Sequence, residues 1–476
     1  MNIIGLISYQ TVTYRRRETA MFIGRSSELE ILNEYLYRDG NQLMILYGQE
    51  GIGKTALLNE FMYDVVDTVY LEALQLSERE QLYQWAEKLQ ERNVKLSEYP
   101  DYAELFQAIS EITGKIEDKK VVIFDEFQNL CKNSTAFFDA LFDFREKADQ
   151  ETYIILCSST TEWIENSLIR KMGIRAKSIT GFFKVKELNF KEFVNYFSEF
   201  SFEECIQGYS IFGGVPALWQ LLNPKYSLKE NLIHYVLNPN HKLYSFGTEL
   251  VERPLRETNV YNTILCALSK GKKKLNDLYA HTEFSRAKIS VYLKNLMEIG
   301  VVEKAYSFDT EGRNNTLKGI YDICNSYVAF TYQFLFGKKQ ELLKLGAQKY
   351  YEEMIEPYLG EFTSVFFAQL CRDYLESQND DGRLPINCQM TGKWIGKVGN
   401  IDFVGRDDKG KTILALCNWQ KPMMRFEDYE WLLFCAKQAK LPADYIYLFS
   451  AGTFDEELKL LQNSRKNIKL INLDTL

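Results

Sequence analysis

The chain has 476 residues, of which 46% are hydrophobic and 26% charged, and its formal net charge is -8. A chain of this length and composition is expected to form about two to four globular domains. The acidic balance excludes a general polycation, so any surface for nucleic acid must be local.

The cysteines and histidines favour neither a disulfide framework nor a metal centre. The nine cysteines form no C-x-x-C pair, and an odd number cannot all pair within the chain. The three histidines lack the spacing of a metal site. No apolar run approaches the ~18–20 residues of a membrane span. We therefore expect a cytoplasmic protein in a reducing compartment, without a membrane partner.

The first 20 residues have a less regular pattern than the rest of the chain. Arg15, Arg16 and Arg17 come after a short apolar stretch at residues 3–7, which reverses the order of a secretory signal. We expect residues 1–20 to be an N-terminal extension and Met21 to be the natural start. N-terminal sequencing of the native protein tests this expectation.

A glycine-rich stretch at residues 48–55, GQEGIGKT, has the most specific pattern in the chain. It follows an apolar run at residues 43–46 and leads into residues 56–61, which predicts the order strand, loop, helix of a phosphate-binding loop. Glycines let backbone N–H groups turn toward phosphate oxygens, and the helix N-terminus adds its positive dipole end. The predicted nucleotide-binding residues are Gly48, Gly51, Ile52, Gly53, Lys54, Thr55 and Ala56.

Two carboxylates follow a second apolar run. Asp125 and Glu126 come directly after the four apolar residues 121–124, about 70 residues beyond the loop. A buried parallel strand would bring them to the edge of the sheet where α/β proteins bind ligands. Lys54 is expected to reach the β- and γ-phosphates of ATP, and Thr55 and Asp125 to hold Mg²⁺. Glu126 is placed to orient or deprotonate the attacking water.

Three other positions each have two interpretations. Ser159 ends the next apolar run and either senses the γ-phosphate or the water, or caps the end of a strand. Arg175 either reaches phosphate or is a solvated loop cation, which the residues alone favour. Arg25 precedes a helix that Ser26 or Ser27 can cap, and it either lies near the nucleotide base or only leads into the helix.

Residues 255–325 follow the order helix, helix, helix, hairpin of a winged helix. Ser285 is expected to cap the third helix at residues 286–299, and residues 311–315 carry a turn signal for the hairpin.

This region is locally basic. Between Lys270 and Lys304 there are eight Lys and Arg against four Asp and Glu, a local balance of +4. Arg286, Lys288 and Lys294 are therefore placed to contact phosphates of duplex DNA. The alternative is a module that only packs inside the protein.

The sequence pattern after the winged helix predicts a helical segment at residues 327–345 and then a second α/β domain. From residue 357 the pattern is helix, three strands, helix, strand, helix, strand, over about 120 residues.

Together, residues 22–25, 48–55, 121–126, 157–159, 173–175 and 213–216 resemble the archaeal-type ATPase family, a branch of the STAND class of AAA+-related P-loop ATPases. The resemblance covers nearly the whole chain from residue 21. It implies an α/β fold, in which a helical lid accompanies the parallel sheet that carries the P-loop. It also places Gly214 and Pro216 against the adenine and Arg175 at the γ-phosphate.

The C-terminal region is similar to the restriction-endonuclease-like domain that accompanies this ATPase in many relatives. Active members carry a helix Glu, a Glu-Ile-Asp and a Glu-x-Lys, whose carboxylates bind Mg²⁺ while the Lys helps to activate water. Here Asp402 ends Asn-Ile-Asp, Leu416-Cys417-Asn418 takes the Glu-x-Lys position, and Ala368 the helix position. Because one carboxylate would not hold a catalytic Mg²⁺, we expect a fold that has lost nuclease activity.

The leading hypothesis is an ATP- and Mg²⁺-binding, STAND-type switch that hydrolyses ATP slowly, as the resemblance implies. A DNA-binding regulator is the first alternative. A nuclease-type defence effector is the second, and Leu416 and Asn418 argue against it. The resemblance also allows a homo-oligomer or a protein partner. The expected regions are a P-loop ATPase domain at 21–182, a helical lid at 183–249, a winged helix at 250–325, a helical linker at 326–356 and the restriction-endonuclease-like domain at 357–476.

Overall fold

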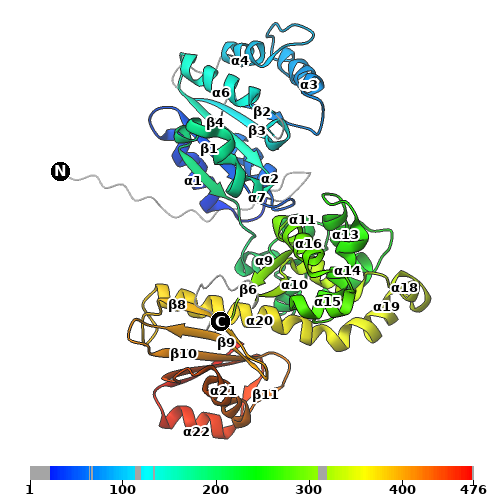
Figure 1. Ribbon diagram of the computed structural model, residues 1–476, viewed down its shortest axis with the longest axis vertical. Helices are drawn as coiled ribbons and strands as arrows, with labels where there is room; N and C mark the ends of the chain where they lie inside the picture. Colours follow the sequence, from blue (N-terminus) through cyan, green and yellow to red (C-terminus); the bar gives the residue numbers. More distant parts are fainter. Residues whose placement is uncertain are drawn as a thin grey trace, which may run out of the picture. The chain divides into compact units, whose positions relative to one another are not determined.

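The computed structural model describes residues 22–63, 65, 68–112, 119–131, 134–308 and 319–473. The N-terminal extension, the expected start at Met21 and the turn signal at 311–315 lie outside these residues. The chain divides into two compact units (Figure 1). The first comprises the described chain up to Glu192 together with Gly214–Gln220, and the second comprises Phe193–Gly213 and the described chain from Leu221 onward.

No described helix combines the length and apolar character that crossing a bilayer requires.

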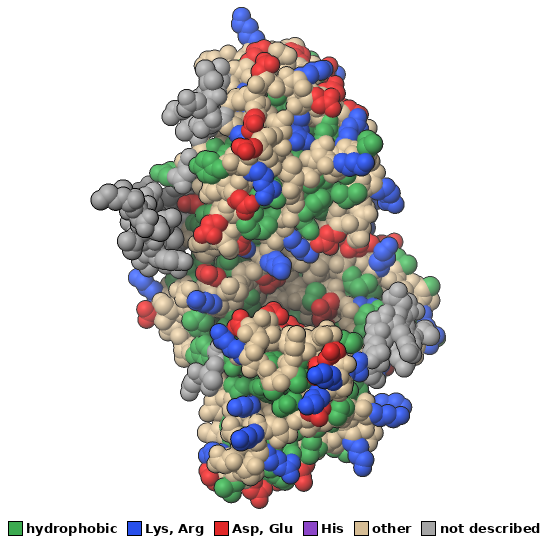
Figure 2. All heavy atoms as spheres, turned by 90° about the vertical axis from the view of Figure 1, so that its left-hand side faces the viewer, with side chains coloured by type: hydrophobic (Ala, Val, Ile, Leu, Met, Phe, Trp, Pro, Cys, Tyr) green, Lys and Arg blue, Asp and Glu red, His purple; other side chains and the backbone are tan. Residues whose placement is uncertain are grey.

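The described surface has mixed charge. On the face drawn in Figure 2, Lys and Arg side chains are interspersed with Asp and Glu side chains. This dispersal fits the modest net charge of the chain.

A five-stranded parallel sheet forms the centre of the first unit, in the order β2-β3-β4-β1-β5. Every residue of β1, β3 and β4 is buried, which explains why their sequences are continuous apolar runs without alternation. The strands are β1 Gln42–Tyr47, β2 Val69–Glu72, β3 Lys120–Asp125, β4 Thr152–Ser158 and β5 Gly181–Lys184.

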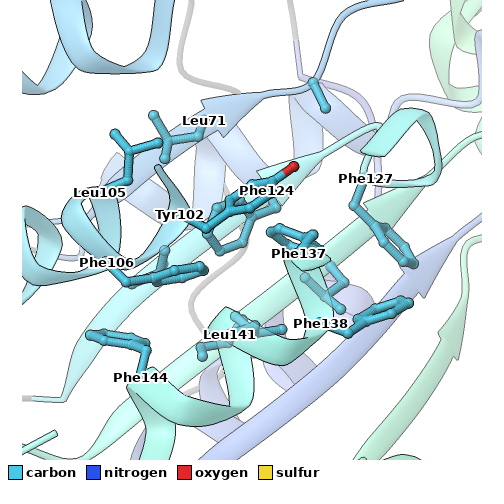
Figure 3. Packing of buried hydrophobic residues seen from close by; sticks show 14 of the residues in the cluster. Leu71, Tyr102, Leu105, Phe106, Phe124, Phe127, Phe137, Phe138, Leu141 and Phe144 are labelled. Carbon is cyan, nitrogen blue, oxygen red and sulfur yellow. The ribbon is translucent and has the colours of Figure 1, made fainter. Parts of the chain in front are cut away.

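Helices cover both faces of this sheet. One face packs against α1 Ser26–Tyr37 and α2 Lys54–Tyr63. The other packs against α3 Glu78–Gln90, α4 Tyr102–Glu111 and α6 Ala136–Lys147, where Phe124 lies among Phe106 and Phe137 (Figure 3). Short helices complete the unit: α5 Gln128–Cys131, α7 Thr161–Trp163, η1 Ile164–Leu168, α8 Ile169–Met172, η2 Gly173–Ser178 and α11 Pro216–Trp219.

The expected cap of α1 is wrong. Ser26 is the first helical residue, and the position before it is taken by Arg25 in a left-handed conformation, with φ 70° and no side-chain cap. Neither Ser26 nor Ser27 therefore caps the helix.

The second unit begins with helices and contains the predicted winged helix order. Ser285 caps α16 as predicted, because its side chain accepts a hydrogen bond from the Lys288 N–H. The elements of this part are α9 Phe190–Tyr196, which begins in the first unit, α10 Phe202–Phe212, α12 Leu228–Asn231, η3 Leu232–Val236, α13 Lys242–Glu252, α14 Thr258–Ser269, α15 Leu275–Thr282, α16 Arg286–Glu298, β6 Val302–Ala305 and β7 Ile320–Ile323.

The helical segment expected at 327–345 is broken in two. The structure has α17 Ser326–Phe334 and α18 Lys339–Leu345, with Gly337 at φ 76° between them. The helices α19 Ala347–Tyr350, η6 Tyr351–Ile355 and the long α20 Glu356–Asp380 follow.

A second five-stranded sheet, in the order β14-β12-β10-β9-β8, forms the C-terminal part. Strand β9 pairs antiparallel with both of its neighbours, whereas β10, β12 and β14 are parallel. Helix α20 lies against one face, and α21 and α22 lie against the other (Figure 1). The elements are β8 Met390–Ile395, β9 Asn400–Arg406, β10 Thr412–Asn418, β11 Met423–Met424, α21 Phe426–Ala439, β12 Tyr445–Ser450, β13 Thr453–Phe454, α22 Glu456–Ser464 and β14 Ile468–Asn472.

Candidate active site

The predicted phosphate-binding loop joins β1 to α2. Gly51 and Gly53 have φ values of 80° and 93°, which favour glycine because a Cβ would clash in this region. Position 48 also requires glycine, because a Cβ there would lie only 2.5 Å from the Val185 carbonyl oxygen. Thr55 and Ala56 are exposed in the first turn of α2, so their backbone and side chains are accessible to a ligand.

Lys54 is held across this loop. Its ammonium group donates hydrogen bonds to the carbonyl oxygens of Gly48 at 2.9 Å and Gln49 at 3.0 Å, and the residue is only 6% exposed. A cation fixed by the loop's own backbone is suited to meet phosphate oxygens held by the same loop.

The end of β3 brings Asp125 to the loop. Its Oδ2 accepts a hydrogen bond from the Thr55 hydroxyl at 3.0 Å, and its Oδ1 accepts one from the Glu126 N–H at 3.0 Å. A hydroxyl and a carboxylate are the hard oxygen ligands that Mg²⁺ prefers, so the two predicted metal residues fit that ion.

Glu126 lies beside Ser159, which comes from the end of β4. The Ser159 hydroxyl and N–H donate to Glu126 Oε2 at 2.6 Å and 3.3 Å, and the Gln128 amide donates to the same oxygen. Glu126 has φ 55°, an uncommon value for a residue with a side chain, which is characteristic of functional sites.

Arg25, which directly precedes α1, contacts the phosphate-binding loop. Its guanidinium donates to the Ile52 carbonyl oxygen at 2.9 Å and to Glu28 at 2.7 Å, and the residue is buried. Burial alone would raise the pKa of Glu28, but hydrogen bonds from Arg25 and Ser27 outweigh it and lower the pKa. Arg25 therefore braces the loop that Ile52 belongs to.

The turn at Gly214 and Pro216 also packs on the loop. The Ala217 N–H donates to the Gly51 carbonyl oxygen at 3.3 Å, and the Pro216 ring lies 3.8 Å from where a Cβ of Gly53 would be. A Cβ on Gly214 would come within 2.0 Å of the Leu188 carbonyl oxygen, so only glycine fits.

Residues 22–222 match a family model described as an ATPase domain predominantly from Archaea. They form an archaeal-type P-loop ATPase domain. The winged helix follows it, where residues 262–304 match bacterial regulatory proteins of the arsR family. Residues 331–430 match a family of archaeal and bacterial proteins of unknown function.

Three proteins resemble most of the chain at low sequence identity. It is 24% identical over 405 residues to an uncharacterized protein, MJECL04, of Methanocaldococcus jannaschii, covering 83% of this chain and 86% of that protein. The ORC2 protein of Aeropyrum pernix is 12% identical with a TM-score of 0.44, covering 65% of this chain and 91% of that one. The Cdc6p of Pyrobaculum aerophilum is 13% identical with a TM-score of 0.33, covering 72% and 97%.

Arg175 of the ATPase domain contacts α6 and not the loop in the described residues. It forms an ion pair with Asp139, and its guanidinium lies 6.0 Å from the centre of the Phe142 ring. Its contact with the γ-phosphate stays a prediction.

Tyr70 belongs to this site but was not predicted. Its hydroxyl donates to Asp125 Oδ2 at 2.6 Å from the neighbouring strand β2. No sequence signal marks it, because a lone tyrosine in a strand is usually a packing residue.

Beyond the ATPase domain, the three predicted DNA-contacting cations lie exposed on α16. Arg286 donates to Asn276 at 3.0 Å and stacks on Tyr279, and Lys294 pairs with Glu298 at 3.6 Å. Lys288 lies 4.8 Å from the Phe284 ring centre. Each contact is at the surface, where such pairs are weak enough to be exchanged for phosphate.

The predicted nuclease position carries few acidic groups. Asp402 Oδ2 accepts the Cys417 N–H at 2.8 Å, and burial raises the pKa of Asp402. Asn418 bonds Lys421 and Ser450, so it closes a turn. Within the described ranges no group of three or more His, Cys, Asp or Glu is arranged to hold a metal ion.

Proposed function

We propose that the protein is a STAND-type nucleotide switch that binds ATP with Mg²⁺ and hydrolyses it slowly. The observation that carries this proposal is the hydrogen bond from Thr55 to Asp125, because it joins the phosphate-binding loop to the carboxylate at the end of β3. These groups come from separate parts of the chain and meet only in the folded domain.

Each loop residue has a role in this proposal. Backbone N–H groups of the loop and Lys54 bind the phosphates, and Thr55 and Asp125 hold Mg²⁺, which supplies charge neutralisation at the phosphates. The turn at Gly214 and Pro216 lies against the adenine, with Arg25 bracing the loop. Different affinities for ATP and ADP would then favour different states of the chain.

Glu126 would orient the attacking water and accept its proton. The three hydrogen bonds from Ser159 and Gln128 all go to Oε2. We therefore assign Oε1 to the water, and Ser159 and Gln128 to holding the carboxylate in place.

The test is ATP binding and hydrolysis by the wild type, Glu126→Gln and Lys54→Ala. Glu126→Gln should retain ATP binding and lose about 10²–10⁴-fold in turnover, the usual contribution of a general base. Lys54→Ala should lose ATP binding while the fold survives. Wild-type turnover in Glu126→Gln, or unchanged ATP affinity in Lys54→Ala, would refute the site.

A second candidate function is binding of duplex DNA through the winged helix, favoured by the exposed cations on α16 and the match of residues 262–304. Salt-dependent binding that Arg286→Ala and Lys288→Ala weaken would support it. Lys409→Ala, in the exposed β9–β10 hairpin, is the charge-matched control. Absence of binding at low salt would discard this function.

We do not favour a nuclease, since Asp402 lacks carboxylate partners at Leu416 and Asn418. Mg²⁺-dependent cleavage of plasmid DNA would overturn that assignment. Assembly with a second copy or another protein is part of the switch proposal, and sedimentation with ATP and with ADP tests it.

A further inference from the structure

Tyr70 lies on the edge strand β2, which pairs in parallel with β3. Tyr70 is opposite Ile123, and Glu72 is opposite Asp125. Because side chains alternate along a strand, Tyr70, Ile123 and Asp125 share one face of the sheet, the face covered by α2. The phenol therefore reaches Asp125 diagonally from the next strand.

Asp125 has about four lone-pair positions for hydrogen bonds. Oδ2 accepts the Tyr70 hydroxyl at 2.6 Å and the Thr55 hydroxyl at 3.0 Å. Oδ1 accepts the Glu126 N–H at 3.0 Å. The Cys157 thiol is also hydrogen-bonded to this carboxylate. Because two hydroxyl donors meet at Oδ2, we assign Oδ1 to a metal-bound water.

The Tyr70 phenol acts only as a donor. An ionised carboxylate can only accept hydrogen bonds, so the proton of the Tyr70 hydroxyl points at Asp125 Oδ2.

The ring of Tyr70 has a separate environment. It borders a cavity of about 340 Å³ whose other lining residues are Met62, Val65, Thr68, Val69, Leu71, Lys88, Leu89 and Arg92. Replacing tyrosine with phenylalanine therefore removes the bond to Asp125 and leaves the ring beside the same neighbours.

We propose that Tyr70 is a positioning residue of the Mg²⁺ site, which fixes the Asp125 carboxylate so that its Oδ1 can meet a metal-bound water. This inference rests on the proposed ATP and Mg²⁺ site. Because Tyr70 acts through Asp125, we expect it to affect the metal requirement without affecting metal-free nucleotide binding.

The test is Tyr70→Phe, with ATP binding and turnover measured against Mg²⁺ concentration. We expect half-maximal Mg²⁺ to rise about tenfold, the lower end of what losing a residue that orients a metal ligand costs. ATP affinity in EDTA should match the wild type. Tyr83→Phe is the control, because it removes an exposed phenol that donates to Glu87 at 3.0 Å on the same unit.

A double-mutant cycle with Asp125→Asn separates positioning from general stability. If Tyr70 acts through Asp125, adding Tyr70→Phe to Asp125→Asn should not raise the Mg²⁺ requirement for ATP binding further. Unchanged Mg²⁺ dependence in a folded Tyr70→Phe, or full additivity in the cycle, would overturn the inference. A wild type whose ATP binding ignores Mg²⁺ would instead refute the proposed function.

Discussion

Two residues of the candidate site have backbone conformations that side chains rarely adopt. Arg25 has φ 70° and Glu126 has φ 55°. Each such conformation costs about 1–3 kcal/mol and persists only where the surroundings enforce it. Here the Arg25 guanidinium is bonded to Ile52 and Glu28, and the Glu126 carboxylate to Ser159, so the contacts that align the site also hold the strained backbone.

Gly214→Ala should damage the site through its backbone. A Cβ would come within 2.0 Å of the Leu188 carbonyl oxygen and 2.7 Å of its nitrogen, and the chain must move because both atoms are backbone. We expect a loss of about 1–3 kcal/mol, typical of overpacking, and weaker ATP binding. Thermal unfolding and ATP titration measure these effects.

Gly360→Ala is the matched control, because position 360 lies inside α20 and a Cβ there meets only Gln420 at 3.9 Å. Alanine should stabilise that helix by about 1 kcal/mol. An equal loss of stability in both variants would contradict the steric argument.

The sequence predicted the parts of the site that are contiguous and lie at strand ends. Lys54, Thr55, Asp125 and Glu126 follow apolar runs, and the sheet topology brings such positions together. Tyr70 was missed because its partner is 55 residues away, and only strand register shows that the two side chains share a face.

At the scale of elements, the long buried strands were predicted, whereas the two-residue strands β11 and β13 were not. The runs in β1, β3 and β4 have six or seven buried residues, which local pattern alone identifies. Strands β11 and β13 have two residues each and exist because they pair with one another. Local sequence carries no signal for pairing between segments so far apart.

The winged helix supplies a residue to the core of the C-terminal sheet. Phe308, just beyond β6, packs in the cluster that contains Trp394, Val404 and Leu432. The Arg406 guanidinium lies 5.2 Å from its ring centre, and the Ser307 hydroxyl accepts the Ile395 N–H at 2.9 Å. These contacts tie the two parts of the second unit together.

Phe308→Ala should therefore destabilise the C-terminal part by about 3–5 kcal/mol, the usual cost of removing a buried aromatic ring. Urea unfolding of the wild type and the variant measures this loss. Tyr306→Ala is the control, since Tyr306 is 40% exposed and its loss should cost about 0.5 kcal/mol or less. Equal costs for both variants would mean that Phe308 is not a core residue.

At the scale of the whole molecule, the candidate nucleotide site lies entirely within the first unit. The phosphate-binding loop, Asp125, Glu126 and the Gly214 turn all belong to it, although the turn comes more than 20 residues after Glu192 in the chain. A chain with two compact units is expected to unfold in more than one step, so the two units can be followed separately by calorimetry.

ATP with Mg²⁺ should raise the unfolding temperature of the first unit. At about 100 times the Kd, a ligand that binds only the folded state stabilises it by about 2.7 kcal/mol. For a unit of this size each kcal/mol raises Tm by about 2–4 °C, so the shift should be roughly 5–11 °C. Lys54→Ala should abolish it, whereas Lys344→Ala, an exposed lysine of α18, should retain it. A full shift in Lys54→Ala would mean that the stabilising ligand binds outside the phosphate-binding loop.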